Sequence, residues 1–313
     1  MNPNEVERNA VMSSLSRRNM VKGFVAGAVL AATEEISHAQ SQAGSPSSSA
    51  SDKVIAPIAR RGRIKQSVCR WCYSRLSVDD ISAFGAKIGL KGVDLLNPDE
   101  YQIPRRYGLI CSMGYAGAGT IKDGLNRLSN HDGIEDGMRK NIPLAAKAGV
   151  PNVITFSGLR AGMQDDEGLR NCVIGLNRIK KIAEDSGINV CMELLNSKVN
   201  HHDYMADNSA WGIKLMQAVN SPNVKLLYDI YHMQIQEGDL TRTIQANIQW
   251  IGHFHTGGVP GRHELNNSQE VQWDGVMRGI VATAYEGFVA HEFLPLASDP
   301  LASLLEAVNL CDV

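Results

Sequence analysis

Four ionisable residues stand near the ends of short apolar runs in the second half of the chain. The runs read CMELLN, KLLYD, IGHFH and FVAHEF, and the residues are Glu193, Asp229, His255 and Glu292. These positions are 36, 26 and 37 residues apart, close to the length of one strand and helix unit each time. Because side chains alternate along a strand, each run can point its ionisable residue toward one common interior.

The chemistry of such a set is that of a divalent metal site. Any one of these residues alone is more often a helix cap, a structural ion pair or a buried core histidine. Four together need a compensating cation, because buried like charges are costly. Three carboxylates and one imidazole suit Mn²⁺, Mg²⁺ or Co²⁺ better than a thiolate-type zinc site. The sequence therefore predicts one divalent metal ion bound by Glu193, Asp229, His255 and Glu292.

Eight strand-like runs that alternate with helical segments would position these residues. The runs are IKQSVCRW, KGVDLL, GLICSMGY, NVITFSG, INVCMELLN, VKLLYDIYH, IGHFHTGG and GFVAHEFLP. Apolar spacing near 3.6 residues predicts helices over 137–149 and 168–187. Eight such units in about 250 residues are typical of a (β/α)₈ TIM barrel, an α/β fold with its active site at the carboxyl ends of the strands. A doubly wound open sheet is the alternative, but no G-x-G-x-x-G follows the first strand.

Two further motifs carry weaker signals. Residues 114–119 (GYAGAG) have the wrong spacing for a dinucleotide fingerprint, and they indicate a flexible loop over the barrel mouth, with a phosphate-binding nest as the lesser alternative. Cys69 and Cys72 form a CxxC pair without a second CxxC or a nearby histidine. We therefore expect both to be small apolar residues of the first strand, not a redox or metal pair.

The first 62 residues are expected to lie outside the folded domain. Residues 1–40 contain SRRNMVK and a short apolar run, a pattern typical of a twin-arginine signal peptide recognised by the Tat export machinery. Residues 41–62 are expected to form a flexible polar linker, because the low-complexity stretch QSQAGSPSSSAS at 40–51 lacks the apolar side chains needed to fold. The barrel is predicted over 63–313. A functional leader places the protein in the periplasm or otherwise outside the cytoplasm, and a non-functional one leaves it in the cytoplasm.

Composition bounds the class of protein. The chain has 313 residues, of which 43% are hydrophobic and 20% charged, so it can bury one large core. Lysine and arginine number 31 against 33 aspartate and glutamate, which gives a formal charge of −2. That balance offers no electrostatic footprint for nucleic acid. The sequence leaves the oligomeric state open and allows a homo-oligomer.

The motifs MELLN, YDIYH, GHFHTGG and HEFLP resemble those of the xylose-isomerase-like TIM barrels, and within them the hydroxypyruvate isomerase and ketose 3-epimerase group. The resemblance covers residues 63–313. It implies that Glu193, Asp229, His255 and Glu292 bind one divalent metal, and that Glu193 and Glu292 also form the catalytic acid/base pair. Residues 257–265 (GGVPGRHEL) resemble the hydroxypyruvate isomerase version of the loop after the seventh strand, where ketose epimerases carry G-E-x-N-R.

This resemblance implies the isomerisation of hydroxypyruvate to tartronate semialdehyde (2-hydroxy-3-oxopropanoate) through an enediolate. His232 matches the substrate-facing histidine of the family. Arg262 can hold the substrate carboxylate bidentately, although a surface arginine paired with Glu264 is nearly as good an interpretation. Lys198 follows the fifth strand and is a further candidate for substrate binding.

Three other functions fit parts of the pattern. A ketose 3-epimerase or another sugar isomerase would use the same metal ligands on a small neutral ketose. A non-catalytic exported sugar-acid binding protein would bind metal or substrate without turnover. A nuclease of the same barrel superfamily would need additional histidine and aspartate ligands and a basic groove, which the sequence does not show.

Overall fold

The computed structural model describes residues 60–117 and 119–313. The predicted signal peptide over 1–40 and the linker up to residue 59 lie outside the described residues. Of the helices in the described part, none is both long and apolar enough to cross a membrane.

The described residues form a closed barrel of eight parallel strands, each paired with its neighbours in chain order and the last with the first. The predicted TIM barrel is therefore confirmed. The strands are β1 (Lys65–Cys69), β2 (Gly92–Leu96), β3 (Ile110–Gly114), β4 (Asn152–Thr155), β5 (Asn189–Leu194), β6 (Val224–Asp229), β7 (Ile251–Thr256) and β8 (Phe288–His291). Each lies within one of the eight predicted runs.

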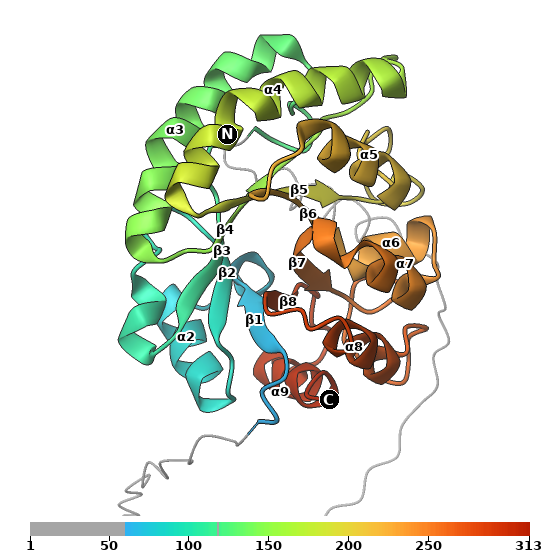
Figure 1. Cartoon of the computed structure of the whole chain (residues 1–313). Helices are drawn as coiled ribbons and strands as arrows, with labels where there is room; N and C mark the ends of the chain where they lie inside the picture. The colour runs from blue at the N-terminus through green and yellow to red at the C-terminus, as the bar shows by residue number, and fades with distance from the viewer. Residues whose placement is uncertain (1–59, 118) are drawn as a thin grey trace, which may run out of the picture. The chain divides into compact units, whose positions relative to one another are not determined.

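Helices surround the strands in the order of the chain, as Figure 1 shows. The α-helices are α2 (Val78–Lys87), α3 (His131–Ala148), α4 (Asp165–Ser186), α5 (Ser209–Val219), α6 (Ile230–Gln236), α7 (Leu240–Asn247), α8 (Trp273–Val281) and α9 (Pro300–Leu310). Short 3₁₀ helices are η1 (Arg70–Tyr73), η2 (Ile103–Tyr107), η3 (Leu128–Asn130) and η4 (Ile248–Trp250).

The two helices predicted from apolar spacing correspond to α3 and α4. Both end where predicted, because Gly149 and Gly187 adopt the left-handed backbone (φ 71° and 64°) that glycine takes without steric cost. Both begin earlier than predicted. The first turn of α4 carries Asp165, Asp166 and Glu167, which suit the positive end of the helix dipole but add no apolar signal to the pattern.

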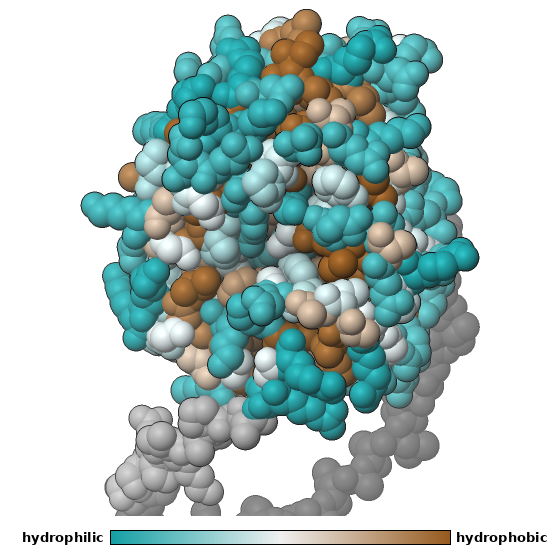
Figure 2. All heavy atoms as spheres, viewed as in Figure 1, coloured by the Kyte–Doolittle hydropathy of each residue, from teal (hydrophilic) through white to brown (hydrophobic). Residues whose placement is uncertain are grey.

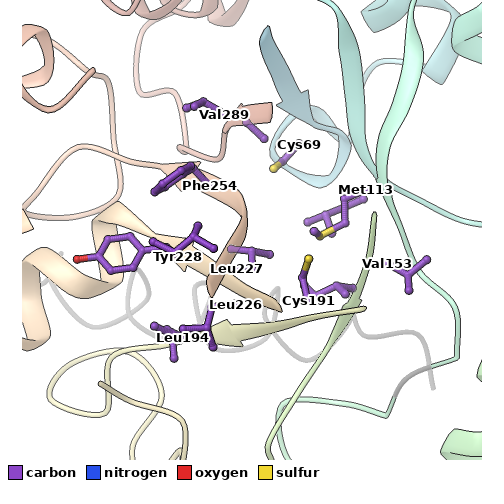
Figure 3. Packing of buried hydrophobic residues seen from close by; sticks show 14 of the residues in the cluster. Cys69, Met113, Val153, Cys191, Leu194, Leu226, Leu227, Tyr228, Phe254 and Val289 are labelled. Carbon is purple, nitrogen blue, oxygen red and sulfur yellow. The ribbon is translucent and has the colours of Figure 1, made fainter. Parts of the chain in front are cut away.

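The barrel interior holds small and medium-sized apolar side chains together with a few buried polar ones, among them Asp94, Ser112 and His253. Figure 3 shows Cys69, Met113, Cys191 and Leu227 among the residues packed between the strands, and all four are buried. On β6 and β7, Tyr228 and Phe254 form an edge-on aromatic pair with ring centroids 6.0 Å apart. The interior is thus a packed core, and its buried polar side chains contact one another, as His253 Nε2 lies 3.2 Å from Asp94 Oδ1.

The expectation for the CxxC pair is wrong for one of its members. Cys69 is the last residue of β1, but Cys72 lies in η1, because the chain turns into a 3₁₀ helix at Arg70. All six cysteines are free thiols. Gly114 ends β3, so the glycine-rich segment does follow a strand, as predicted.

The face of the protein seen in Figure 2 is mainly polar. Figure 2 shows hydrophilic side chains over most of the visible face, with hydrophobic ones in small separate areas. Among the described residues, Leu296 and Val199 are the most exposed large hydrophobic side chains, at 72% and 60% of their surface.

Candidate active site

The four predicted metal ligands meet at the carboxyl ends of β5 to β8. Glu193 and His255 are the penultimate residues of β5 and β7, Asp229 is the last residue of β6, and Glu292 directly follows β8. One ligand atom from each lies within 4.8 Å of the others. All four residues are buried. The backbone NH of Glu292 donates to the Thr256 carbonyl at 2.9 Å, which continues the strand pairing and keeps this glutamate in line with the other three.

The side chains of this cluster are in direct contact. His255 Nδ1 lies 2.8 Å from Glu292 Oε2 and 3.5 Å from Glu193 Oε1. Arg262 Nη2 lies 3.3 Å from Asp229 Oδ2 and forms a closer contact with Glu292 Oε2. Three carboxylates therefore share one imidazole and one guanidinium, so ionised carboxylates leave the cluster with excess negative charge.

The pKa values of the carboxyl groups reflect this crowding. Burial raises the pKa of Glu193 and raises that of Asp229 to about 7. Burial also acts against ionised Glu292, but the charges of Arg262 and His255 outweigh it and hold the pKa of Glu292 below its ordinary value. Two of the three carboxyl groups are thus poorly compensated by the protein alone, which is the situation that a bound cation corrects.

Asp94 on β2 orients His255, and sequence analysis missed it. Its Oδ2 lies 2.9 Å from His255 Nε2, and its Oδ1 lies 3.2 Å from His253 Nε2. Ser112 donates its hydroxyl to the same carboxylate. Burial favours protonated Asp94, but the nearby His253 and the hydrogen bond to His255 outweigh burial and lower the pKa of Asp94. The available signal was a lone carboxylate inside the apolar run KGVDLL.

The donor set fits a divalent metal ion. With Nε2 directed at Asp94, His255 presents Nδ1 to the carboxylates, where this buried nitrogen has no hydrogen bond of good geometry within the described residues. A metal-ligating histidine usually donates its other ring NH to a carboxylate, as His255 does to Asp94. Glu193, Asp229, His255 and Glu292 could therefore hold one metal ion.

Two aromatic residues that sequence analysis did not select border the cluster. Trp71, in η1, donates its indole NH to Glu292 Oε1 at 2.6 Å. The Arg262 guanidinium carbon lies 5.2 Å from the centre of the Trp71 ring and 5.4 Å from that of Tyr231. Aromatic faces at this distance attract a guanidinium, so they help to hold Arg262 beside the carboxylates.

His232 lies beside the cluster, in the first turn of α6. Asp229 caps this helix by accepting from the backbone NH of Tyr231 at 2.8 Å and of His232 at 3.3 Å. His232 Nδ1 accepts from the Asn196 side chain at 2.6 Å, which leaves Nε2 3.6 Å from Asp229 Oδ2. Burial, with the Arg262 charge nearby, lowers the pKa of His232 well below its ordinary value. A neutral imidazole with a donor NH therefore faces the site.

The other two predicted substrate residues differ in their placement. Arg262 is buried and turned into the cluster. Its proposed surface partner Glu264 instead accepts from the backbone NH groups of Leu296 and Ala297 at 2.7 and 3.0 Å, so the surface-pair interpretation of Arg262 is wrong. Lys198 is exposed, and its Nζ donates to the Gln236 carbonyl at 2.7 Å.

Several proteins of known sequence resemble this chain. A Danio rerio protein provisionally named hydroxypyruvate isomerase is 28% identical over 126 residues, 40% of this chain and 46% of that protein. The 2-oxo-tetronate isomerase of Pectobacterium atrosepticum is 26% identical over 223 residues, 67% of this chain and 84% of that protein. The D-psicose 3-epimerase of Agrobacterium fabrum is 38% identical over 97 residues, 30% of this chain and 32% of that protein. The chain thus spans less than half the length of the first of these relatives.

Solved structures share the fold. An AP endonuclease, family 2, from Brucella melitensis superposes with a TM-score of 0.70 at 21% identity, over 77% of this chain and 96% of that one. A D-psicose 3-epimerase crystallised in the presence of D-fructose gives a TM-score of 0.60 at 19% identity, over 78% and 90% of the two chains. The family model described as xylose isomerase-like TIM barrel matches residues 105–307. Since that match covers more than half of the chain, and the eight-stranded barrel agrees with it, the chain belongs to the xylose isomerase-like TIM barrel family.

Proposed function

We propose that this protein is a metal-dependent isomerase that converts hydroxypyruvate to tartronate semialdehyde. The observation that carries the proposal is the buried cluster of Glu193, Asp229, His255 and Glu292, with the Arg262 guanidinium in contact with it. The named relatives that isomerise or epimerise small hydroxycarbonyl compounds support the same class of chemistry.

The four ligands would hold one Mn²⁺, Mg²⁺ or Co²⁺ ion. When bound, the ion supplies Lewis acidity, because it stabilises negative charge that develops on two adjacent substrate oxygens. Asp229 and His255 are held in place from behind, Asp229 by the first turn of α6 and His255 by Asp94. A ligand set that is oriented in advance needs little rearrangement during the reaction.

Glu193 and Glu292 would move the protons. One of them takes the proton from C3 of hydroxypyruvate, which gives an enediolate, and the other delivers a proton to C2. The hydroxyl proton of C3 passes to the C2 oxygen, so the product is an isomer and needs no co-reactant. The two carboxylates approach His255 Nδ1 at 3.5 and 2.8 Å, so both border the space where substrate oxygens would lie.

Arg262 and His232 would bind the rest of the substrate. Arg262 has the fork of donors that matches a carboxylate, and hydroxypyruvate carries one. His232 directs a buried NH toward the site and can donate to a substrate oxygen. Lys198, exposed and bonded to the Gln236 carbonyl, can reach the substrate only if that bond is released.

The second candidate is a ketose 3-epimerase. The 38% identity to a D-psicose 3-epimerase over 97 residues favours it, and the same two glutamates would serve on both faces of a ketose carbon. A neutral ketose has no carboxylate for Arg262, so the two candidates differ in the use of this residue.

A substrate panel tests the proposal. The barrel would be loaded with Mn²⁺ and offered hydroxypyruvate, other 2-keto acids and free ketoses in D₂O, with product formation and deuterium incorporation measured together. Turnover of hydroxypyruvate with deuterium at C2 of the product is expected. Turnover of ketoses alone would select the epimerase, whereas binding without turnover or exchange would select a non-catalytic binding protein.

For the leader, we propose export by the twin-arginine route, supported by the SRRNMVK pattern alone. Since that route carries folded cargo, the barrel would fold and load its metal before export. Changing Arg17 and Arg18 together to Lys should keep the protein in the cytoplasm. Wild-type protein found in the cytoplasmic fraction with residues 1–40 intact would refute this.

A further inference from the structure

Arg262 lies among the carboxylates that are expected to hold the metal. It is only 8% exposed, and its Nη2 contacts both Asp229 Oδ2, at 3.3 Å, and Glu292 Oε2. Its Nε also donates to the Glu292 backbone carbonyl at 3.2 Å. The guanidinium thus already provides a positive charge at the oxygens of two predicted metal ligands.

The same oxygens face His255. Glu292 Oε2, which Arg262 contacts, is also the atom 2.8 Å from His255 Nδ1. A metal held by Glu292 and His255 would therefore lie within a few ångströms of the guanidinium. Two positive charges at that separation repel each other strongly in a buried site. Close contact of Arg262 with both carboxylates and tight metal binding thus oppose one another.

The backbone of Arg262 is fixed, so any adjustment falls to its side chain. Its NH donates to the Gly258 carbonyl at 2.8 Å, and its carbonyl accepts from the Leu294 NH at 2.6 Å. Its φ of 59° is in the left-handed region, which is uncommon for a residue with a side chain and is often found at functional sites. The long side chain can rotate while these backbone bonds persist, with the faces of Trp71 and Tyr231 available to the guanidinium.

We propose that Arg262 is a tethered cation that competes with the divalent metal for Asp229 and Glu292. Metal entry moves the guanidinium off Asp229, and the released donors then take the carboxylate of the substrate. Arg262 in this way weakens metal binding by the empty enzyme and makes the anion-binding group available only after the metal has bound. The inference rests on the proposed function, because it takes the four-residue cluster as the metal site.

Metal affinity tests this directly, without any assay of activity. Mn²⁺ would be titrated into metal-stripped wild type, Arg262→Gln and Arg262→Lys, and the free ion would be counted by electron paramagnetic resonance. Arg262→Gln removes the competing charge and should bind Mn²⁺ more tightly, on the order of tenfold or more. Arg262→Lys keeps the charge and should remain near wild type. Arg278→Gln, which breaks an exposed pair with Asp274, is the matched control and should not change the affinity.

Thermal unfolding provides the second measurement and shows whether each variant folds. Metal-stripped Arg262→Gln should melt below wild type, because three carboxylates lose their internal cation, and Mn²⁺ should raise its Tm by more than it raises that of wild type. Unchanged or weaker Mn²⁺ binding by a folded Arg262→Gln would overturn the competition while leaving the proposed function intact. Failure of the wild type to bind any divalent ion would overturn both.

Discussion

His255 and His291 lie on neighbouring strands of the barrel, both fully buried, yet their surroundings differ in charge. His255 faces the interior, where Asp94 and Glu292 lie 2.9 and 2.8 Å from its two nitrogens. His291 lies between neutral groups, with Nδ1 3.1 Å from Thr256 Oγ1 and Nε2 2.8 Å from Gln66 Oε1.

The two pKa values respond in opposite directions. Burial alone lowers the pKa of His291 to about 3. Burial also acts to lower the pKa of His255, but Cys69, Glu292 and the hydrogen bond to Asp94 outweigh it and raise this pKa well above its ordinary value. Burial of a histidine is therefore compatible with a purely structural role, and it is the excess of negative charge around His255 that supports the proposed metal site.

The largest expected effect is the loss of kcat when Glu292, the carboxylate beside His255, is changed. Glu292→Gln keeps an oxygen for the metal but cannot exchange a proton with carbon. General acid and base groups contribute roughly 10²–10⁴-fold, so kcat on hydroxypyruvate should fall by about that factor while Mn²⁺ content falls much less. Parallel measurement of kcat, bound metal and deuterium exchange checks this. Normal exchange and turnover in the variant would limit Glu292 to the role of a ligand.

A loss of metal-dependent stability is expected when a ligand without a role in proton transfer is changed. Asp229→Asn should lower Mn²⁺ affinity and remove most of the stabilisation that the metal adds to wild type. At a metal concentration of 100 times Kd that stabilisation is about 2.7 kcal/mol. Urea unfolding with and without Mn²⁺ measures it, with EDTA as the control that should make wild type behave like the variant. Equal Mn²⁺ stabilisation of both proteins would exclude Asp229 as a ligand.

A change of Asp94, which contacts His255 Nε2, should lower Mn²⁺ affinity less than a change of a predicted ligand. Asp94→Asn leaves the four ligands in place but weakens the hold on the His255 ring. Groups of this kind typically change metal affinity by about 10–100-fold. Ser112→Ala removes one hydrogen bond to Asp94 without removing its charge and is the graded control. Mn²⁺ affinities that rank wild type above Ser112→Ala above Asp94→Asn are expected, and an unaltered Asp94→Asn affinity would contradict the orienting role.

The neutral surroundings of His291 predict that the stability of the protein depends on pH. His291 has a pKa of about 3 in the folded protein and an ordinary value of 6.5, so the unfolded chain binds its proton first as the pH falls. The contribution of neutral His291 to the free energy of unfolding is fully present above pH 6.5. It is lost as the pH falls toward 3, by up to about 1.4 kcal/mol per pH unit. Denaturant unfolding between pH 7 and 4.5 should show a shallower fall for His291→Gln than for wild type. Identical slopes would mean that His291 is protonated without penalty.

The sequence by itself was sufficient for the barrel and for the meeting of the four predicted ligands at one end of it. The barrel could be predicted because a run of alternating or continuous apolar residues indicates a strand, and apolar residues spaced about 3.6 positions apart indicate a helix. The regular spacing of Glu193, Asp229, His255 and Glu292 along four successive runs then followed from the repeated strand and helix unit.

The surroundings of the predicted ligands were decided by the tertiary structure. Asp94 contacts His255 across 161 residues of sequence, and Trp71 contacts Glu292 across 221, so no local pattern reports either pair. The inward turn of Arg262 depends on backbone bonds to Gly258 and Leu294, and the outward placement of Lys198 depends on the Gln236 carbonyl. The net charge around a buried side chain depends on neighbouring residues from many strands. Only the closure of the barrel determines which residues those are.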